Sequence, residues 1–142
     1  MHEDPPFEIR LIETHAGIPI YLLAYLEPTI LTAEKEFAQI RAILEACGDS
    51  FSVIMDYRNL SNASDYGPEE QAKVYGTPEH LQLKGRAITF VRYQAVSFTS
   101  MIQTMRANML MRSSANSNFA PDFESAIRFT RRAIDHALER VR

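Results

Sequence analysis

The feature that most constrains the fold is a nearly apolar run in the middle of the chain, Phe51-Ser-Val-Ile-Met55, which Asp56 ends. A strand that is apolar on both faces belongs inside a sheet that is covered on both faces. An amphipathic helical stretch, residues 33–47, precedes this run, and a polar, turn-rich segment follows it. This order is typical of a βαβ unit, so we expect residues 51–55 to form the central strand of an α/β domain.

The other expected elements follow from hydrophobic periodicity. Residues 7–12 alternate apolar and polar side chains, and with residues 18–26 they predict an antiparallel hairpin near one edge of the sheet. Residues 86–92 resemble a second central strand, and residues 118–120 a short edge strand. We expect about four helical regions, at residues 33–47, 68–83 as two short pieces, 98–111, and from Asp122 onward. The prediction is one α/β domain, residues 1–142, with a mixed sheet of about five strands and a flexible tail at residues 1–6.

Cysteine and histidine usage argues against a metal or disulfide framework. In the first helix, the residues at spacings of four and three predict one stripe facing the sheet: Ala33, Phe37, Ile40, Leu44 and Cys47. Cys47, the single cysteine, is therefore expected to be a buried packing residue. The four histidines are scattered, and we expect no metal site and no cofactor. With no apolar run of membrane-spanning length and no signal-like N-terminus, the expected location is the cytoplasm.

The net charge of −3 is distributed unevenly along the chain. Residues 1–83 hold 5 basic and 14 acidic side chains, whereas residues 84–142 hold 10 basic and 4 acidic. The simpler interpretation is mutual compensation of the two halves within the fold. The alternative is a basic face for an anionic partner, with Arg128, Arg131 and Arg132 as candidate anion-binding residues. No aromatic-interleaved basic stretch accompanies them, so nucleic-acid binding is not expected.

The candidate site lies where the central strands end, because ligands of open α/β sheets bind at the carboxyl ends of the strands. The candidate residues of this rim are Asp56, Tyr57, Arg58, Asn59, Tyr66 and Tyr93. Asp56 has two interpretations. It is either a general base helped by Arg58 or Arg92, or, as we favour, a structural acceptor of backbone or arginine hydrogen bonds.

Three stretches together give a resemblance to a known family. They are Val53-Ile-Met-Asp-Tyr-Arg58, Gly85-Arg-Ala-Ile-Thr-Phe-Val91 and Asn118-Phe-Ala-Pro-Asp-Phe-Glu-Ser-Ala-Ile-Arg-Phe129. In their order and element pattern the chain resembles the SpoIIAA-like (STAS-like) family over nearly its whole length. The resemblance implies a regulatory or binding module rather than an enzyme. It also implies a phosphorylated serine after the third strand in one branch, for which Ser61 and Ser64 are candidates by position, although the Asp-Ser-(Ser/Thr)-Gly motif is missing.

Three functions remain open from the sequence. The leading one is a non-catalytic module that binds a protein partner or itself, through a helix face and residues 58–67. The second is a binder of small apolar or anionic ligands, with residues 66–83 as a lid over the strand ends. An enzyme is third, since no set of acid, base and nucleophile stands out. The methionines of residues 98–111 face either the core or an interface, which the sequence leaves open.

Overall fold

The protein is described here from a computed structural model, which covers residues 6–30, 32–61, 68–93, 117–120 and 122–140. A five-stranded mixed sheet forms its centre, in the order β1 (Phe7–His15), β2 (Ile18–Tyr25), β4 (Phe51–Asp56), β6 (Ala87–Tyr93) and β7 (Ser117–Ala120). The β1–β2 pair is antiparallel, and the other neighbouring pairs are parallel. A small parallel pair, β3 (Thr29–Ile30) with β5 (Leu60–Ser61), lies apart from the main sheet.

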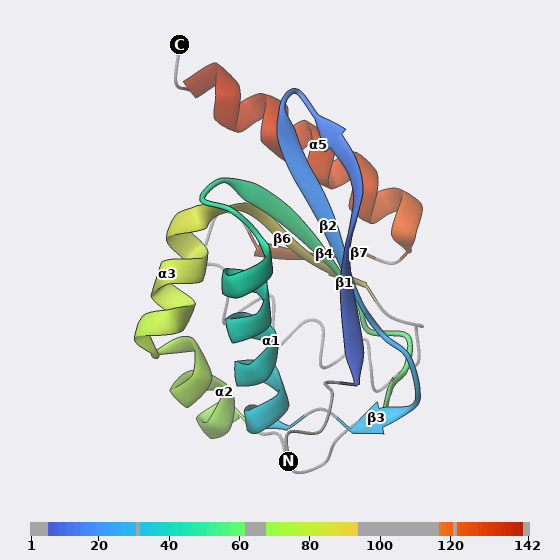
Figure 1. The fold of residues 1–142 in the computed structure, drawn as a ribbon, viewed down its shortest axis with the longest axis vertical. Coiled ribbons are helices and arrows are strands. Elements are labelled where there is room, and N and C mark those ends of the chain that lie inside the picture. Colours follow the sequence, from blue (N-terminus) through green and yellow to red (C-terminus); the bar gives the residue numbers. More distant parts are fainter. Residues whose placement is uncertain (1–5, 31, 62–67, 94–116, 121, 141–142) are drawn as a thin grey trace.

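Helices cover both faces of this sheet (Figure 1). On one side lie α1 (Ala33–Ala46), α2 (Pro68–Tyr75) and α3 (Pro78–Arg86), and on the other lies α5 (Phe123–Arg140). The predicted α/β class, the mixed sheet of about five strands and the break of the second helical region into two short pieces are all confirmed. The predicted helix at residues 98–111 falls outside the described residues.

The central position predicted for residues 51–55 is confirmed, because β4 has two strands on each side and all six of its residues are buried. Alternate side chains point to opposite faces of a strand. Phe51, Val53 and Met55 accordingly join the core beneath α1, α2 and α3, while Ile54 joins the core beneath α5. A strand that contributes to two cores needs apolar residues on both faces, which is why four of the six residues of β4 are apolar and only Ser52 and Asp56 are polar.

The N-terminal hairpin occupies one edge of the sheet, as its alternating pattern predicts. Its turn consists of Ala16 and Gly17, both at positive φ (53° and 83°), a conformation that glycine adopts without steric cost. Of the tail predicted for residues 1–6, residues 1–5 lie outside the described residues, and Pro6 is bonded to the hairpin. The carbonyl of Pro6 accepts a hydrogen bond from the N–H of Leu26 (3.0 Å), so Pro6 already belongs to the ladder.

The buried stripe predicted for α1 is partly wrong. Ile40 and Cys47 are buried as expected, and Ala33 and Leu44 pack against the same core as partly buried residues. Phe37 is only partly buried and lines the hollow described below, and Ile43 takes a core position that the pattern missed. Two polar side chains, Glu36 and Gln39, are also buried on this helix. The helix is therefore rotated relative to its apolar pattern, toward polar partners beneath it.

Both ends of α1 are capped by side chains. At its start, Thr32 Oγ1 accepts the backbone N–H of Lys35 (3.2 Å). At its end, Nη2 of Arg86 donates to the carbonyl oxygens of Leu44 (3.0 Å), Cys47 (2.7 Å) and Gly48 (3.0 Å). A cation at this position satisfies carbonyls that have no partner within the helix and complements the helix dipole.

The last two elements follow the prediction closely. The short strand expected at residues 118–120 is β7, at the edge opposite β1. Asp122 precedes α5, and its Oδ1 accepts the N–H of Ser125 (2.7 Å), as expected of a capping residue. The buried stripe of α5 is Ala126, Ile127, Thr130 and Ile134.

Candidate functional site

The carboxyl ends of the parallel strands meet at one edge of the sheet, as the sequence predicts. The register places Asp56 of β4 between Ala24 of β2 and Tyr93 of β6, and Tyr93 opposite Ala120 of β7. The backbone of two predicted rim residues, Asp56 and Tyr93, is therefore side by side. Tyr66 and Ser64 lie outside the described residues, and of Ser61 and Tyr93 the structure describes the backbone alone.

Asp56 closes the turn after β4. Its Oδ1 accepts the backbone N–H of Arg58 (3.0 Å) and the Nε–H of the same residue (3.0 Å), and its Oδ2 accepts Nε–H (3.1 Å) and Nη2–H (2.7 Å). The aspartate is buried, whereas the arginine side chain is 65% exposed. Hydrogen bonds from a guanidinium to both carboxylate oxygens are what the structural interpretation of Asp56 predicts; its role stays a prediction.

Asn59 links the ends of β2 and β4. The side-chain Nδ2 of Asn59 donates to the backbone carbonyl of Tyr25 (2.8 Å), and the backbone carbonyl of Asn59 accepts the N–H of Thr29 (2.8 Å). These bonds hold the loop after β2 against the loop after β4, and the small β3–β5 pair continues the same contact. We expected the side chains of Asp56 and Asn59 to be available to a ligand. They are instead engaged in hydrogen bonds that hold the loops at the strand ends.

Tyr57 points into the core instead of lining an open rim. Only 5% of it is exposed, and its hydroxyl donates to Oε1 of Gln39 (2.9 Å) and approaches the sulfur of Met55 (3.6 Å). Gln39 in turn donates from Nε2 to the hydroxyl of Tyr25. Burial raises the pKa of the Tyr25 hydroxyl above its ordinary value of 10, against the opposing effect of the Gln39 hydrogen bond.

This tyrosine–glutamine cluster, defined as Tyr25, Gln39 and Tyr57, was missed from the sequence. The only signal for it is a polar residue on the face of the first helix that also carries Ile40 and Ile43. The two tyrosine partners of Gln39 lie 14 and 18 residues away along the chain, so hydrophobic periodicity gives no hint of them. The cluster joins α1 to the ends of β2 and β4 beneath the rim.

The three candidate anion-binding arginines of α5 are not equivalent. Arg131 donates from Nε (2.9 Å) and Nη2 (2.7 Å) to the two carboxylate oxygens of Glu13 on β1. Arg128 donates from Nε to the backbone carbonyl of Glu124 (3.4 Å). Arg132 is exposed. A three-arginine anion site is weakened by this geometry, because one member is already neutralised.

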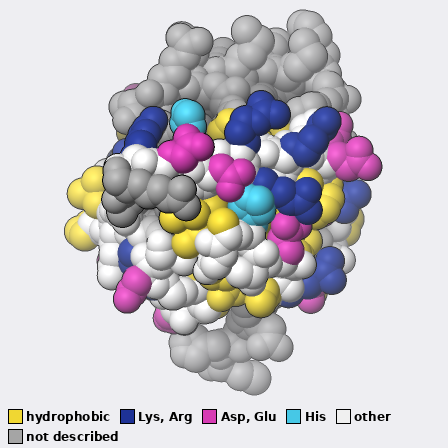
Figure 2. Space-filling model, turned by 90° about the horizontal axis from the view of Figure 1, so that it is seen from above, with side chains coloured by type: hydrophobic (Ala, Val, Ile, Leu, Met, Phe, Trp, Pro, Cys, Tyr) yellow, Lys and Arg dark blue, Asp and Glu magenta, His cyan; other side chains and the backbone are white. Residues whose placement is uncertain are grey.

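The pairs between β1 and α5 favour mutual compensation of the two oppositely charged halves of the chain. Besides Glu13 with Arg131, Nε2 of His15 lies 2.8 Å from Oδ1 of Asp135. Figure 2, which views the molecule from the top of Figure 1, shows positive and negative side chains interspersed on this face rather than separated. Hydrogen bonding from the Arg131 guanidinium holds the pKa of Glu13 below its ordinary value.

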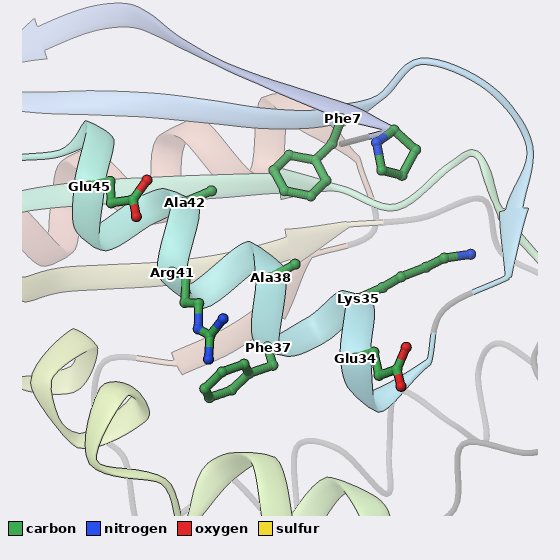
Figure 3. Close-up of a pocket in the computed structure, with 9 residues that line it drawn as sticks. Phe7, Glu34, Lys35, Phe37, Ala38, Arg41, Ala42 and Glu45 are labelled. Atoms are coloured by element: carbon green, nitrogen blue, oxygen red, sulfur yellow. The ribbon is translucent and has the colours of Figure 1, made fainter. Parts of the chain in front are cut away.

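A surface hollow of about 350 Å³ lies between α1 and the start of β1, and no sequence pattern pointed to it. Pro6 and Phe7 form one wall, and side chains of α1 form the rest, as Figure 3 shows: Glu34, Lys35, Phe37, Ala38, Arg41, Ala42 and Glu45. The Arg41 guanidinium lies 4.2 Å from the centre of the Phe37 ring, a cation–π contact. The hollow is amphipathic, with two alanines flanked by an aromatic ring and charges of both signs.

Other kinds of site find no support among the residues that the structure describes. No three His, Cys, Asp or Glu side chains there come together as a metal-ion cluster. In that same part of the chain, no helix has the length and apolarity needed to cross a membrane. Cys47 is buried, and burial raises the pKa of its thiol to about 11, opposed by the nearby Arg86 guanidinium.

Comparison with known proteins identifies the fold. Neither a protein-family model nor a curated protein matches the sequence. Among solved structures, the chain is similar to an uncharacterized protein of the DUF3478 family with a SpoIIAA-like fold, from Shewanella loihica PV-4. The TM-score is 0.54 at 14% sequence identity, and the match covers 92% of this chain and 99% of the other. This chain has a SpoIIAA-like fold. The fold that the three sequence stretches predicted is thereby confirmed, and the SpoIIAA-like architecture extends over almost the whole chain.

Proposed function

We propose that this SpoIIAA-like chain is a non-catalytic protein-interaction module that associates with a second copy of itself. The observation that carries the proposal is an exposed leucine and an amphipathic hollow at the two ends of one edge strand. Leu11 on β1 is 55% exposed, and the amphipathic hollow lies over the other end of the same strand. Burial of such side chains is the usual driving force of protein association.

The engagement of the most reactive side chains supports a module without catalysis. The carboxylate of Asp56 is occupied by Arg58, and the thiol of Cys47 is buried with a raised pKa. An active site needs an acid, base or nucleophile that can reach a substrate. In the described residues these groups stabilise turns and cores instead. The lone, buried thiol also supports the cytoplasmic location that we propose for the module, since thiols persist in reducing compartments.

The alternative, a small-molecule binder, rests on the volume of the hollow. Its 350 Å³ falls at the lower end of the range of ligand pockets, which is roughly 300–1,000 Å³. Such pockets usually enclose most of their ligand, whereas one helix face, Pro6 and the first residue of β1 line this hollow. Glu34, Ala38, Arg41 and Glu45 are themselves exposed, a geometry that suits a side chain from a partner protein better than an enclosed ligand.

Sedimentation equilibrium of the full chain tests the proposal. The weight-average mass should rise from that of one chain toward that of two between roughly 1 μM and 1 mM, the range expected for a small interface. A mass that stays at one chain over this range would exclude self-association. A matched control is the charge-reversal variant Glu69→Arg, which changes an exposed residue of α2 and should associate like the wild type.

A further inference from the structure

The outer edge of β1 is open in the part of the sheet that the structure describes. β1 is the first strand in the sheet order, and it extends over nine residues without proline. Long exposed edges offer unpaired N–H and C=O groups to another strand, and proteins often protect them with short strands, prolines or charges of one sign. Here the charged residues between Pro6 and the β-bulge that follows Leu11 are Glu8 and Arg10, which have opposite signs.

The register of the hairpin shows which backbone groups face outward. The bond from Leu26 N–H to Pro6 C=O makes Pro6 and Leu26 a hydrogen-bonded pair of the antiparallel ladder. Such pairs alternate with non-bonded pairs, so Glu8 opposite Ala24 and Arg10 opposite Leu22 are bonded to β2. The N–H and C=O groups of Phe7, Ile9 and Leu11 therefore point away from β2, toward the open edge.

A two-fold axis at Ile9 would let the outward-facing N–H and C=O groups of β1 bond to the same groups of a second copy. We propose that two copies pair antiparallel through the outer edges of β1, so that two five-stranded sheets become one continuous sheet. Phe7 of each copy then lies opposite Leu11 of the other, and Ile9 opposite Ile9. These are the outward-facing residues, which exchange about six backbone hydrogen bonds. The proposal deepens the proposed self-association by naming its surface, and it rests on that function.

Charge selects this register over its neighbours. With the axis at Ile9, Glu8 of each copy faces Arg10 of the other in a non-hydrogen-bonded pair, where opposed side chains approach most closely. An axis at Glu8 would oppose two glutamates, and an axis at Arg10 would oppose two arginines. Isologous pairing requires a surface that is complementary to itself. Among these three positions of the axis, only the one at Ile9 places opposite charges of residues 7–11 against each other.

The hollow gives a place for the exposed leucine. Side chains at positions of equal parity share a face of the strand, so Leu11 lies on the same face as Phe7 and Ile9, which pack against the core beneath α1. In the paired sheet, Leu11 of one copy stands next to Phe7 of the other, and Phe7 lines the hollow (Figure 3). Two hollows related by the axis each receive one leucine. The β-bulge between Leu11 and Glu13 ends the paired stretch at one side, and Pro6 ends it at the other.

Charge reversal provides the first test. Glu8→Arg and Arg10→Glu each place like charges opposite each other twice in the dimer, and each should raise its Kd at least about tenfold. The double variant Glu8→Arg/Arg10→Glu restores both pairs and should return the Kd to within about threefold of the wild type. Both positions are exposed, and circular dichroism confirms that the variants fold. Glu69→Arg is the matched control.

Two results distinguish this inference from the proposed function. If the wild type associates and both single variants associate as tightly as Glu69→Arg, the β1 edge is not the interface, although self-association stands. If the wild type stays a monomer, both proposals are excluded. A swap that fails to rescue two folded, weakened single variants would reject the axis at Ile9.

Amide hydrogen exchange followed by NMR gives a second, alternating signature. The amides of Glu8 and Arg10 are bonded to β2 and should be protected at every concentration. The amides of Phe7, Ile9 and Leu11 should exchange quickly in dilute protein and become protected as the dimer forms. Concentration-independent exchange at these three amides in a protein that dimerises would overturn the proposal.

Discussion

Ser52 is a buried polar residue whose hydroxyl has no hydrogen-bond partner within the described residues. It lies in β4 on the face toward α5, beside Ile54. A buried unpaired hydroxyl carries a desolvation cost without a compensating bond. We predict that Ser52→Ala raises the free energy of unfolding by about 1 kcal/mol, measured by urea titration. Thr130→Ala serves as the contrast, because that hydroxyl donates to Ala126 C=O (2.8 Å) and its loss should destabilise the protein. A destabilised Ser52→Ala would mean that the hydroxyl is bonded.

Two buried acids, Cys47 and Tyr25, should make the fold sensitive to alkali. Burial raises the pKa of the Cys47 thiol from 9.0 to about 11 and raises the pKa of Tyr25 above 10.0. A raised pKa in the folded state favours the protonated form, so this contribution to stability is complete below the unfolded pKa and is lost as the pH rises through the folded pKa. We predict that the free energy of unfolding is steady near pH 8 and falls from about pH 9 upward. Cys47→Ala should reduce that slope. An unchanged slope in both Cys47→Ala and Tyr25→Phe would contradict the assignment.

At the scale of elements, the tyrosine–glutamine cluster fixes α1 on the sheet. Removing Gln39 leaves two buried hydroxyls without their partner, whereas removing one hydroxyl takes away a single bond. We predict that Gln39→Leu lowers the free energy of unfolding by about 2–4 kcal/mol and Tyr57→Phe by about 1 kcal/mol. In the double variant the two losses of unfolding free energy should be less than additive. Tyr57→Phe removes one of the two hydroxyls whose hydrogen bond to Gln39 is lost in Gln39→Leu. Additive costs would show that the two side chains act independently.

The elements differ in how well their sequences predict them. The position of β4 follows from its own composition, since a strand that is apolar on both faces has no other place in a sheet. The edge position of β1 follows from its alternation in the same way. The rotation of α1 does not, because Glu36 and Gln39 break the apolar pattern and are accommodated by atoms of other elements. The exposure of Tyr57 was mispredicted for the same reason. A tyrosine that follows a strand can be exposed or buried, and here the buried Gln39 provides a hydrogen-bond partner for its hydroxyl inside the core.

At the scale of the whole molecule, the Glu13–Arg131 pair joins parts of the chain separated by 118 residues. Hydrogen bonding from Arg131 lowers the pKa of Glu13 in the fold, so its contribution to stability is present above the unfolded pKa of 4.5 and is lost as the pH falls through the folded pKa. We predict that Glu13→Gln flattens the acid limb of the stability curve below about pH 4.5 and leaves pH 7 stability lowered only slightly, because the pair is partly exposed to solvent. An acid limb identical to that of the wild type would contradict this.

The candidate site shows the limit of the sequence at this largest scale. The sequence correctly placed Asp56 and Tyr93 at one edge of the sheet. Each residue ends a strand that is recognisable from its own sequence, and the carboxyl ends of parallel strands lie at the same edge. The hollow depends on how the start of β1 meets the exposed face of α1, more than 25 residues later in the chain. The partner of Arg131 depends on the packing of the last helix against the first strand. Both require the three-dimensional arrangement, which no spacing rule encodes.

The position of α5 has a consequence for how the protein is made. Ile20, Leu22 and Ile54 form the sheet face that α5 covers, yet α5 begins at Phe123 and is synthesised well after β4, which ends at Asp56. At roughly 5–20 residues per second, several seconds separate the synthesis of β4 from that of α5. Throughout that interval we expect this sheet face to be without the cover of α5. We expect chains interrupted before residue 123 to keep this apolar face uncovered and therefore to aggregate or bind chaperones more readily than the complete domain.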